Sequence, residues 1–235
     1  MSESIDVRVT PSLHPINVRE IDGYDDETST LLGPTESAFA HAYEELIKVH
    51  DASEIVRADP TLTEAAAVVK AADFADRTFA TIAKRFDSAV ANLNVVIGSI
   101  EQELSAPVES RASNSLSAEI RAYCKALPDG ERMSFVTQAI KDGDQRTATA
   151  VLGGPAYLSG ITGDMQSLLT RMFHEHHSPL AAKRLKAAKG ALALIGERSG
   201  LVFREMEKSV GADPKKVAKF RAAAAKTAKA FARDA

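Results

Sequence analysis

The chain of 235 residues has one cysteine, no tryptophan and few aromatic side chains. Its single cysteine, Cys124, has no partner for an internal disulfide, and so low a cysteine content fits a reducing compartment. No run of about 18 apolar residues occurs, so we expect no membrane-spanning helix. The N-terminal sequence has no basic start followed by an apolar core, so no export signal is visible and we expect a cytoplasmic location.

Sequence motifs of common catalytic sites are also missing. The glycines from Gly153 to Gly163 match neither a phosphate-binding loop nor a dinucleotide-binding turn. No GxSxG motif is present, and no histidine neighbours Cys124 in the sequence. Paired carboxylates such as Glu44 and Glu45 lie in polar segments without the apolar surroundings that acid–base catalysis requires. We therefore expect a protein that is not an enzyme and has no cofactor.

Strand signals are weak and confined to the N-terminus. Apolar residues alternate over 4–9 and again over 16–21, and Pro11 and Pro15 separate the two segments. Two such short segments cannot form a sheet-based core, so we predict that residues 1–33 form an extended arm followed by an acidic loop. Such an arm packs along its own helices or on a neighbouring subunit, through Ile5, Val7 and Val9.

The stretch from Pro60 to Leu104 has the longest periodic pattern. From Ala65 to Leu104, apolar residues recur in steps of four and three, interrupted only by Asp76, which is the 3.5-residue period of a coiled-coil seam. A second apolar row, from Val68 to Val96, runs beside it. The pattern predicts a long helix over 60–105 that needs other long helices to bury it. We expect association within the chain or between copies through Phe79, Phe86, Val90, Leu93, Ile97 and Ile100.

The other helix signals divide the chain into four regions and predict an all-α fold. After the arm of 1–33, a helical hairpin over 34–106 contains the long helix. Glycine and proline separate short helices over 107–177. Residues 178–235 combine a second four-three row, from Ala181 to Met206, with a final basic helix after Asp213-Pro214. We expect a long-helix, coiled-coil-like bundle with short helices in the middle of the chain.

The net charge of −3 is unevenly distributed. Residues 178–235 hold 14 Lys and Arg against 5 Asp and Glu, a net of +9, which leaves −12 for residues 1–177. Three interpretations of the basic final helix stay open: nucleic-acid contact, docking on an acidic subunit, or a solvated face. No known nucleic-acid-binding motif accompanies it. The cations concerned are Lys215, Lys216, Lys219, Arg221, Lys226 and Lys229.

The sequence His174-Glu175-His176-His177 is the sharpest polar cluster. His174 and His177 are three residues apart and can share one helix face, a spacing that suits a transition metal. The zincin motif fails because residue 178 is serine, where that motif requires histidine. The simpler interpretation is a polar helix end, where imidazoles suit the helix dipole. We expect no metal here and keep the two histidines as weak candidates.

The segment from Lys125 to Gly160, KALPDGERMSFVTQAIKDGDQRTATAVLGGPAYLSG, resembles a segment of uncharacterised proteins of bacteriophages and prophages. It covers about a sixth of the chain and brings no catalytic or binding residue with it. The resemblance implies a phage or prophage protein, such as a virion or assembly component, and therefore a location in the cytoplasm or the virion.

These patterns favour a non-enzymatic structural or assembly protein. We expect it to associate with itself through the long helices or to pack with other subunits of an assembly. Two alternatives remain: a nucleic-acid-binding module that uses the basic C-terminal helix, and a metal-binding protein or enzyme centred on His174–His177.

Overall fold

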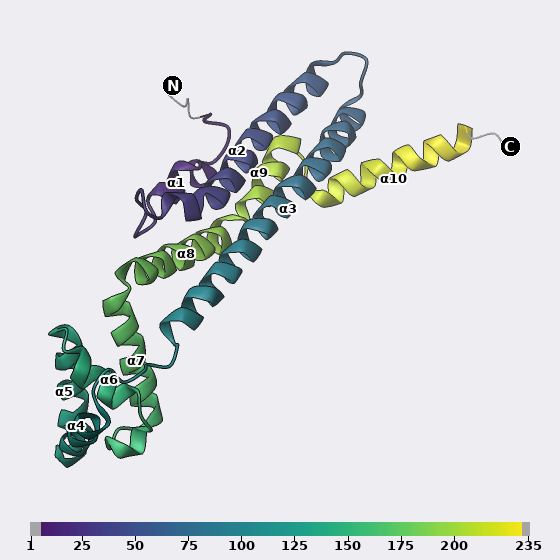
Figure 1. Ribbon diagram of the computed structural model, residues 1–235. Coiled ribbons are helices and arrows are strands. Elements are labelled where there is room, and N and C mark those ends of the chain that lie inside the picture. The colour runs from purple at the N-terminus through teal and green to yellow at the C-terminus, as the bar shows by residue number, and fades with distance from the viewer. Residues whose placement is uncertain (1–5, 232–235) are drawn as a thin grey trace. The chain divides into compact units, whose positions relative to one another are not determined.

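The computed structural model describes residues 6–231 (Figure 1). Every regular element in this range is a helix, so the fold is all-α, as the helical patterns predicted. The chain forms two compact units, one of Met1–Asn94 and Ala187–Ala235 and the other of Val95–Lys186. Among the described residues, no helix is long and apolar enough to cross a membrane.

The first unit is built from long helices. Its elements are η1 (Pro11–Leu13), α1 (Ile16–Arg19), α2 (Ser29–Ala58), most of α3 (Glu64–Leu104), the later part of α8 (Pro179–Arg198), α9 (Leu201–Val210) and α10 (Pro214–Phe231). Helix α2 packs most extensively against α9, far away in the sequence. Phe39 of α2 meets Phe86 of α3 edge to face, with ring centroids 5.0 Å apart. The core therefore joins the N-terminal helices to a C-terminal one.

The N-terminal segment is folded onto α2, and the prediction of an extended arm is wrong for its described residues. Turns, η1 and α1 replace the two expected strands, because Pro11 and Pro15 start helical turns instead of only separating extended segments. Val9, Leu13 and Val18 are fully buried. Of the arm residues, Val7 is 91% exposed, Val9 is buried in its own chain, and Ile5 lies outside the described residues.

The long helix α3 begins four residues later than predicted. Asp59 uses its carboxylate to accept hydrogen bonds from the amide and hydroxyl of Thr61, at 2.8 and 2.6 Å, and so closes a turn instead of capping a helix. The hydroxyl of Thr63 instead accepts from the amide of Ala66, at 3.2 Å. The helix then runs without interruption from Glu64 to Leu104.

The buried face of α3 does not follow the predicted 3.5-residue period. Its buried positions recur every eleven residues, close to the natural period of a straight helix. A heptad row drifts by about 20° per repeat on such a helix, so it leaves the buried face along its length. On the predicted row, Phe79 is exposed and Val90 half-buried. The buried residues that follow this eleven-residue repeat are Ala71, Ala75, Thr78, Ile82, Phe86, Ala89, Leu93, Ile97, Ile100 and Leu104.

The second unit is a cluster of short helices. It holds α4 (Asn114–Ala126), α5 (Asp129–Lys141), α6 (Gln145–Leu152), η2 (Ala156–Leu158) and α7 (Gly163–His177). Glycine, proline and hydroxyl caps end and start these helices, as at Thr162, whose side chain accepts from the amide of Met165 at 3.2 Å. A shared apolar core is formed by Cys124, Val136, Ile140, Ala148, Val151, Leu152, Ile161, Leu169 and Phe173.

The predicted second long helix is divided into α8 and α9. Ser199 and Gly200 lie between them, and both residues are poor helix formers that commonly mark kinks. The predicted row still packs inward on both sides of this break, since Leu185, Ile195 and Val202 are buried. Gly211 ends α9 in the left-handed conformation, with φ of 68°.

Candidate docking surface of the C-terminal helix

Helix α10 starts where local sequence signals predict it. The carboxylate of Asp213 accepts a hydrogen bond from the amide of Lys216 at 2.8 Å, and Pro214 occupies the first helical position. Alanine and lysine then favour helix up to Phe231. The helix has 18 residues.

The side chains of α10 divide into two opposite faces. At about 100° per residue, Val217, Phe220, Ala224, Ala228 and Phe231 share one side of the helix. Four lysines lie on the other side, and none of them forms an ion pair within the described part of the chain: Lys215, Lys219, Lys226 and Lys229. Helix α10 is therefore amphipathic, with an apolar row opposite a row of lysines.

Ion pairs to α3 hold the first half of α10 in place. Lys216 lies 3.3 Å from Glu64, and Arg221 lies 2.6 Å from both Asp73 and Asp76. Hydrogen bonds to these two aspartates raise the pKa of Arg221 further above its usual value. Two of the six cations expected to contact a partner are thus neutralised within the chain.

The second half of α10 is uncovered. Val217 is 7% exposed, whereas every residue from 222 to 231 is exposed and Phe231 is 82% exposed. Figure 1 shows this half of the helix with no other helix of its unit beside it. The apolar row is therefore buried at its start and open to solvent at its end.

An apolar groove lies beside the start of α10. Its volume is about 440 Å³, and α3, α9 and α10 all contribute to its walls. Phe79 and Phe203 meet across it with ring centroids 6.3 Å apart, and they are 38% and 50% exposed. Other lining residues are Ala72, Ala75, Asp76, Met206, Glu207, Val210, Ala212, Pro214, Val217, Ala218 and Arg221.

The residues expected to mediate self-association are mostly packed within the chain. Phe86, Leu93, Ile97 and Ile100 are at most 9% exposed. Val90 is half-buried, and Phe79 alone of the six lines the groove. The sequence pattern does not indicate Phe203, because this residue follows Val202 and lies beside the apolar row from Ala181 to Met206.

The two candidate metal ligands are engaged in structural hydrogen bonds. Nε2 of His174 lies 2.8 Å from the carbonyl oxygen of Ala106, and Nδ1 of His177 lies 2.8 Å from that of Phe173. Since a carbonyl only accepts, each of these ring nitrogens carries the proton. Nε2 of His177 then accepts from the side-chain amide of Gln145 at 2.8 Å. Over residues 6–231, no three His, Cys, Asp or Glu side chains form a group that could hold a metal ion.

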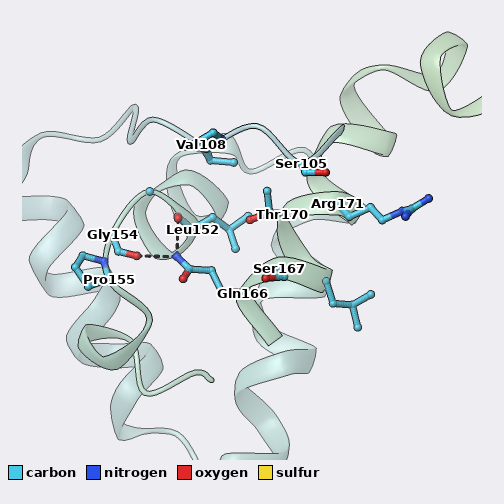
Figure 2. A pocket seen from close by; sticks show the side chains of 12 residues that line it. Ser105, Val108, Leu152, Gly154, Pro155, Gln166, Ser167, Thr170 and Arg171 are labelled. Atoms are coloured by element: carbon cyan, nitrogen blue, oxygen red, sulfur yellow. Dashed lines mark hydrogen bonds between the residues drawn. The ribbon is translucent and has the colours of Figure 1, made fainter. Parts of the chain in front are cut away.

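The second unit has a groove of about 720 Å³ next to the Gly153-Gly154-Pro155 turn (Figure 2). The side-chain amide of Gln166 donates to the carbonyls of Leu152 and Gly154, at 2.9 and 2.7 Å, and so holds the turn against α7. A methyl group on Gly153 would approach three backbone atoms at 2.8 Å, so the turn requires glycine there.

The polar side chains of this groove serve the fold. The hydroxyl of Ser167 donates to the carbonyl of Gly163 at 3.0 Å, and Arg171 pairs with Glu175 at 2.9 Å. No cysteine, histidine or carboxylate is among the lining residues, which are Ser105, Pro107, Val108, Leu152, Gly153, Gly154, Pro155, Gln166, Ser167, Leu168, Thr170 and Arg171. The groove thus presents no nucleophile–base pair.

A buried polar set also lies in the first unit. His50 and Ser53 of α2 and Glu205 of α9 are at most 8% exposed. Burial lowers the pKa of His50, as does the positive charge of Arg8. Neither of the two grooves is lined by these residues, so their arrangement bears on stability.

The comparisons with known proteins give no guide to function. No protein-family model, no curated protein and no solved structure matches this chain. The docking surface of α10 and its adjacent groove therefore have to be interpreted from their own physical chemistry.

Proposed function

We propose that the protein is a non-enzymatic assembly subunit that associates through α10. The uncovered part of the apolar row, from Ala224 to Phe231, is the observation that supports this proposal. An isolated helical segment shorter than about 12–15 residues is only marginally stable in water, so a partner that covers this row would stabilise it. Amphipathic helices commonly bind by laying their apolar face into a groove of another protein.

Neither of the two grooves described above contains a nucleophile–base pair, which favours assembly over catalysis at these grooves. The lining residues of the first-unit groove include carboxylates but no histidine, cysteine, serine or threonine. Asp76, one of these carboxylates, is neutralised by Arg221 at 2.6 Å. The resemblance of the segment 125–160 to phage and prophage proteins supports a phage particle as the assembly concerned.

Mass measurement in solution tests this proposal. The full chain is expected to form a defined oligomer in light scattering or analytical ultracentrifugation. A variant that ends at Arg221 is expected to be monomeric with its other helices intact by circular dichroism. An oligomer that survives this truncation would contradict association through α10.

Nucleic-acid binding is the second candidate function. Its support is the row of four lysines on the solvent side of α10, which form no ion pair with any residue of 6–231, since Lys–phosphate contacts give most of the affinity for non-specific DNA. The double variant K226E/K229E is expected to abolish a DNA mobility shift at low salt while leaving the oligomer unchanged. No shift of the unaltered protein at low salt would rule this function out.

A further inference from the structure

We propose that the groove between α3, α9 and α10 receives the end of α10 from a second copy of this chain, in a reciprocal, two-fold dimer. This inference rests on the proposed association through α10, and it names a second copy of the chain as the partner. Two separate features lead to it: an apolar groove whose rim aromatics are half-exposed, and an apolar helix end that lacks a cover.

A copy's own helix end cannot fill its own groove. Val217 lines the groove, and Phe231 is 14 residues farther along the same continuous helix. At about 1.5 Å per residue, this places Phe231 about 21 Å away along the axis. The occupant must therefore come from another molecule.

The apolar row of α10 matches an antiparallel copy of itself. It has a phenylalanine at each end, Phe220 and Phe231, and two alanines between them, Ala224 and Ala228. In an antiparallel pair centred on these alanines, each Phe231 comes beside Phe220 and Val217 of the other helix, at the mouth of its groove. The alanines allow the two backbones to approach closely, and the large side chains fill the ends.

Charge also favours this arrangement. The four free lysines lie on the side of α10 opposite to the apolar row, so paired helices keep their lysines apart. The groove also contains one acidic side chain that is not paired with Arg221, Glu207, and its charge attracts an incoming basic helix.

Reciprocity makes the contact larger and closed. Each copy contributes one helix end and one groove. The dimer therefore contains two identical contacts, in each of which the helix end of one copy lies in the groove of the other. A pair of exposed helix ends without the grooves would fall at the low end of interface sizes. The groove contacts from α3 and α9 therefore determine whether the dimer is stable.

Two matched pairs of variants test the arrangement. Phe231→Glu is expected to weaken the dimer by roughly tenfold or more, because it places a charge in an apolar groove, whereas Lys226→Ala on the opposite side leaves it unchanged. Both sites are exposed, so folding is unaffected. Dissociation constants come from sedimentation equilibrium of the full chain.

Disulfide trapping tests the register. In this register each Ala224 faces Ala228 of the other copy, so Ala224→Cys mixed with Ala228→Cys is expected to form an interchain disulfide under mild oxidation, whereas Ala222→Cys, on the lysine side, mixed with Ala228→Cys does not. The native Cys124 is fully buried and does not compete.

The outcomes separate the inference from the proposed function. A monomeric full chain at all accessible concentrations overturns both. An oligomer that truncation after Arg221 abolishes but Phe231→Glu leaves unchanged, or equal trapping at residues 222 and 224, overturns only this arrangement. Loss with Phe231→Glu together with selective trapping at residue 224 supports it.

Discussion

Two phenylalanines on α3 provide a direct test of how this helix is buried. Phe79 and Phe86 are seven residues apart, so a heptad seam would bury them equally. In the structure Phe86 is 5% exposed and packs edge to face on Phe39, whereas Phe79 is 38% exposed at the rim of a groove. The two alanine variants are therefore expected to differ strongly in their free energy of unfolding.

The magnitudes follow from burial. Phe86→Ala removes a fully enclosed ring, leaves a cavity and loses the aromatic pair, which together cost about 4 kcal/mol. Phe79→Ala opens onto solvent and leaves no closed cavity, so only part of the transfer free energy is lost, about 1–1.5 kcal/mol. With a urea slope of about 3 kcal/mol/M, the midpoints fall by about 1.3 M and by at most about 0.5 M.

The assay is urea unfolding followed by far-ultraviolet circular dichroism, at one low protein concentration for all three proteins. The variants must keep the native helical signal before denaturation, so that the comparison concerns the same fold. Equal losses for Phe79→Ala and Phe86→Ala would refute the eleven-residue burial pattern and restore the heptad seam. A larger loss for Phe79→Ala would show that the groove is closed by other contacts.

Three further predictions concern particular groups. Gly211→Ala is expected to cost about 1–2 kcal/mol, because φ is 68° and the added methyl would collide with the guanidinium of Arg57. The free energy of unfolding is expected to fall as the pH drops below about 6.5. Burial lowers the pKa of His50, so in this range the unfolded chain takes up a proton that the folded chain does not. Urea midpoints between about pH 8 and pH 5.5 measure this fall. Cys124 is expected to react with a thiol reagent only after unfolding, because it is fully buried and desolvation raises its pKa.

Each of these predictions has its own control. Gly98→Ala, in α3 with open space around the added methyl, is expected to stabilise by about 0.5–1 kcal/mol, opposite in sign to Gly211→Ala. His50→Gln is expected to remove part of the pH dependence, and an unchanged slope would exclude His50 as its source. Rapid labelling of Cys124 in the absence of denaturant would contradict its burial.

Helix ends follow local chemistry where the decisive contacts are near in sequence. Thr162, Gly211 and the Asp213-Pro214 pair act on backbone groups within a few residues, so their role follows from chemistry that the sequence already contains. The start of the long helix was predicted at residue 60, but the side-chain turn from Asp59 to Thr61 delays it to Glu64.

The candidate site was only partly predictable. The sequence identified the basic helix after Pro214 and placed Phe79 on an apolar row. It did not identify the groove, because Phe79 and Phe203 are more than a hundred residues apart in sequence and meet only through packing. It also did not show that Glu64, Asp73 and Asp76 neutralise part of the basic helix.

The sequence by itself determined the all-α class, the start of α10 at Asp213-Pro214 and the amphipathic character of that helix, because these depend on propensity and on groups close along the chain. Only the tertiary structure decided which side of α3 is buried, that the N-terminal segment folds onto α2, and that the row of α10 is covered at Val217 but open at Phe231. Those outcomes depend on which distant surfaces come together, and periodicity restricts the choice of partners without selecting one.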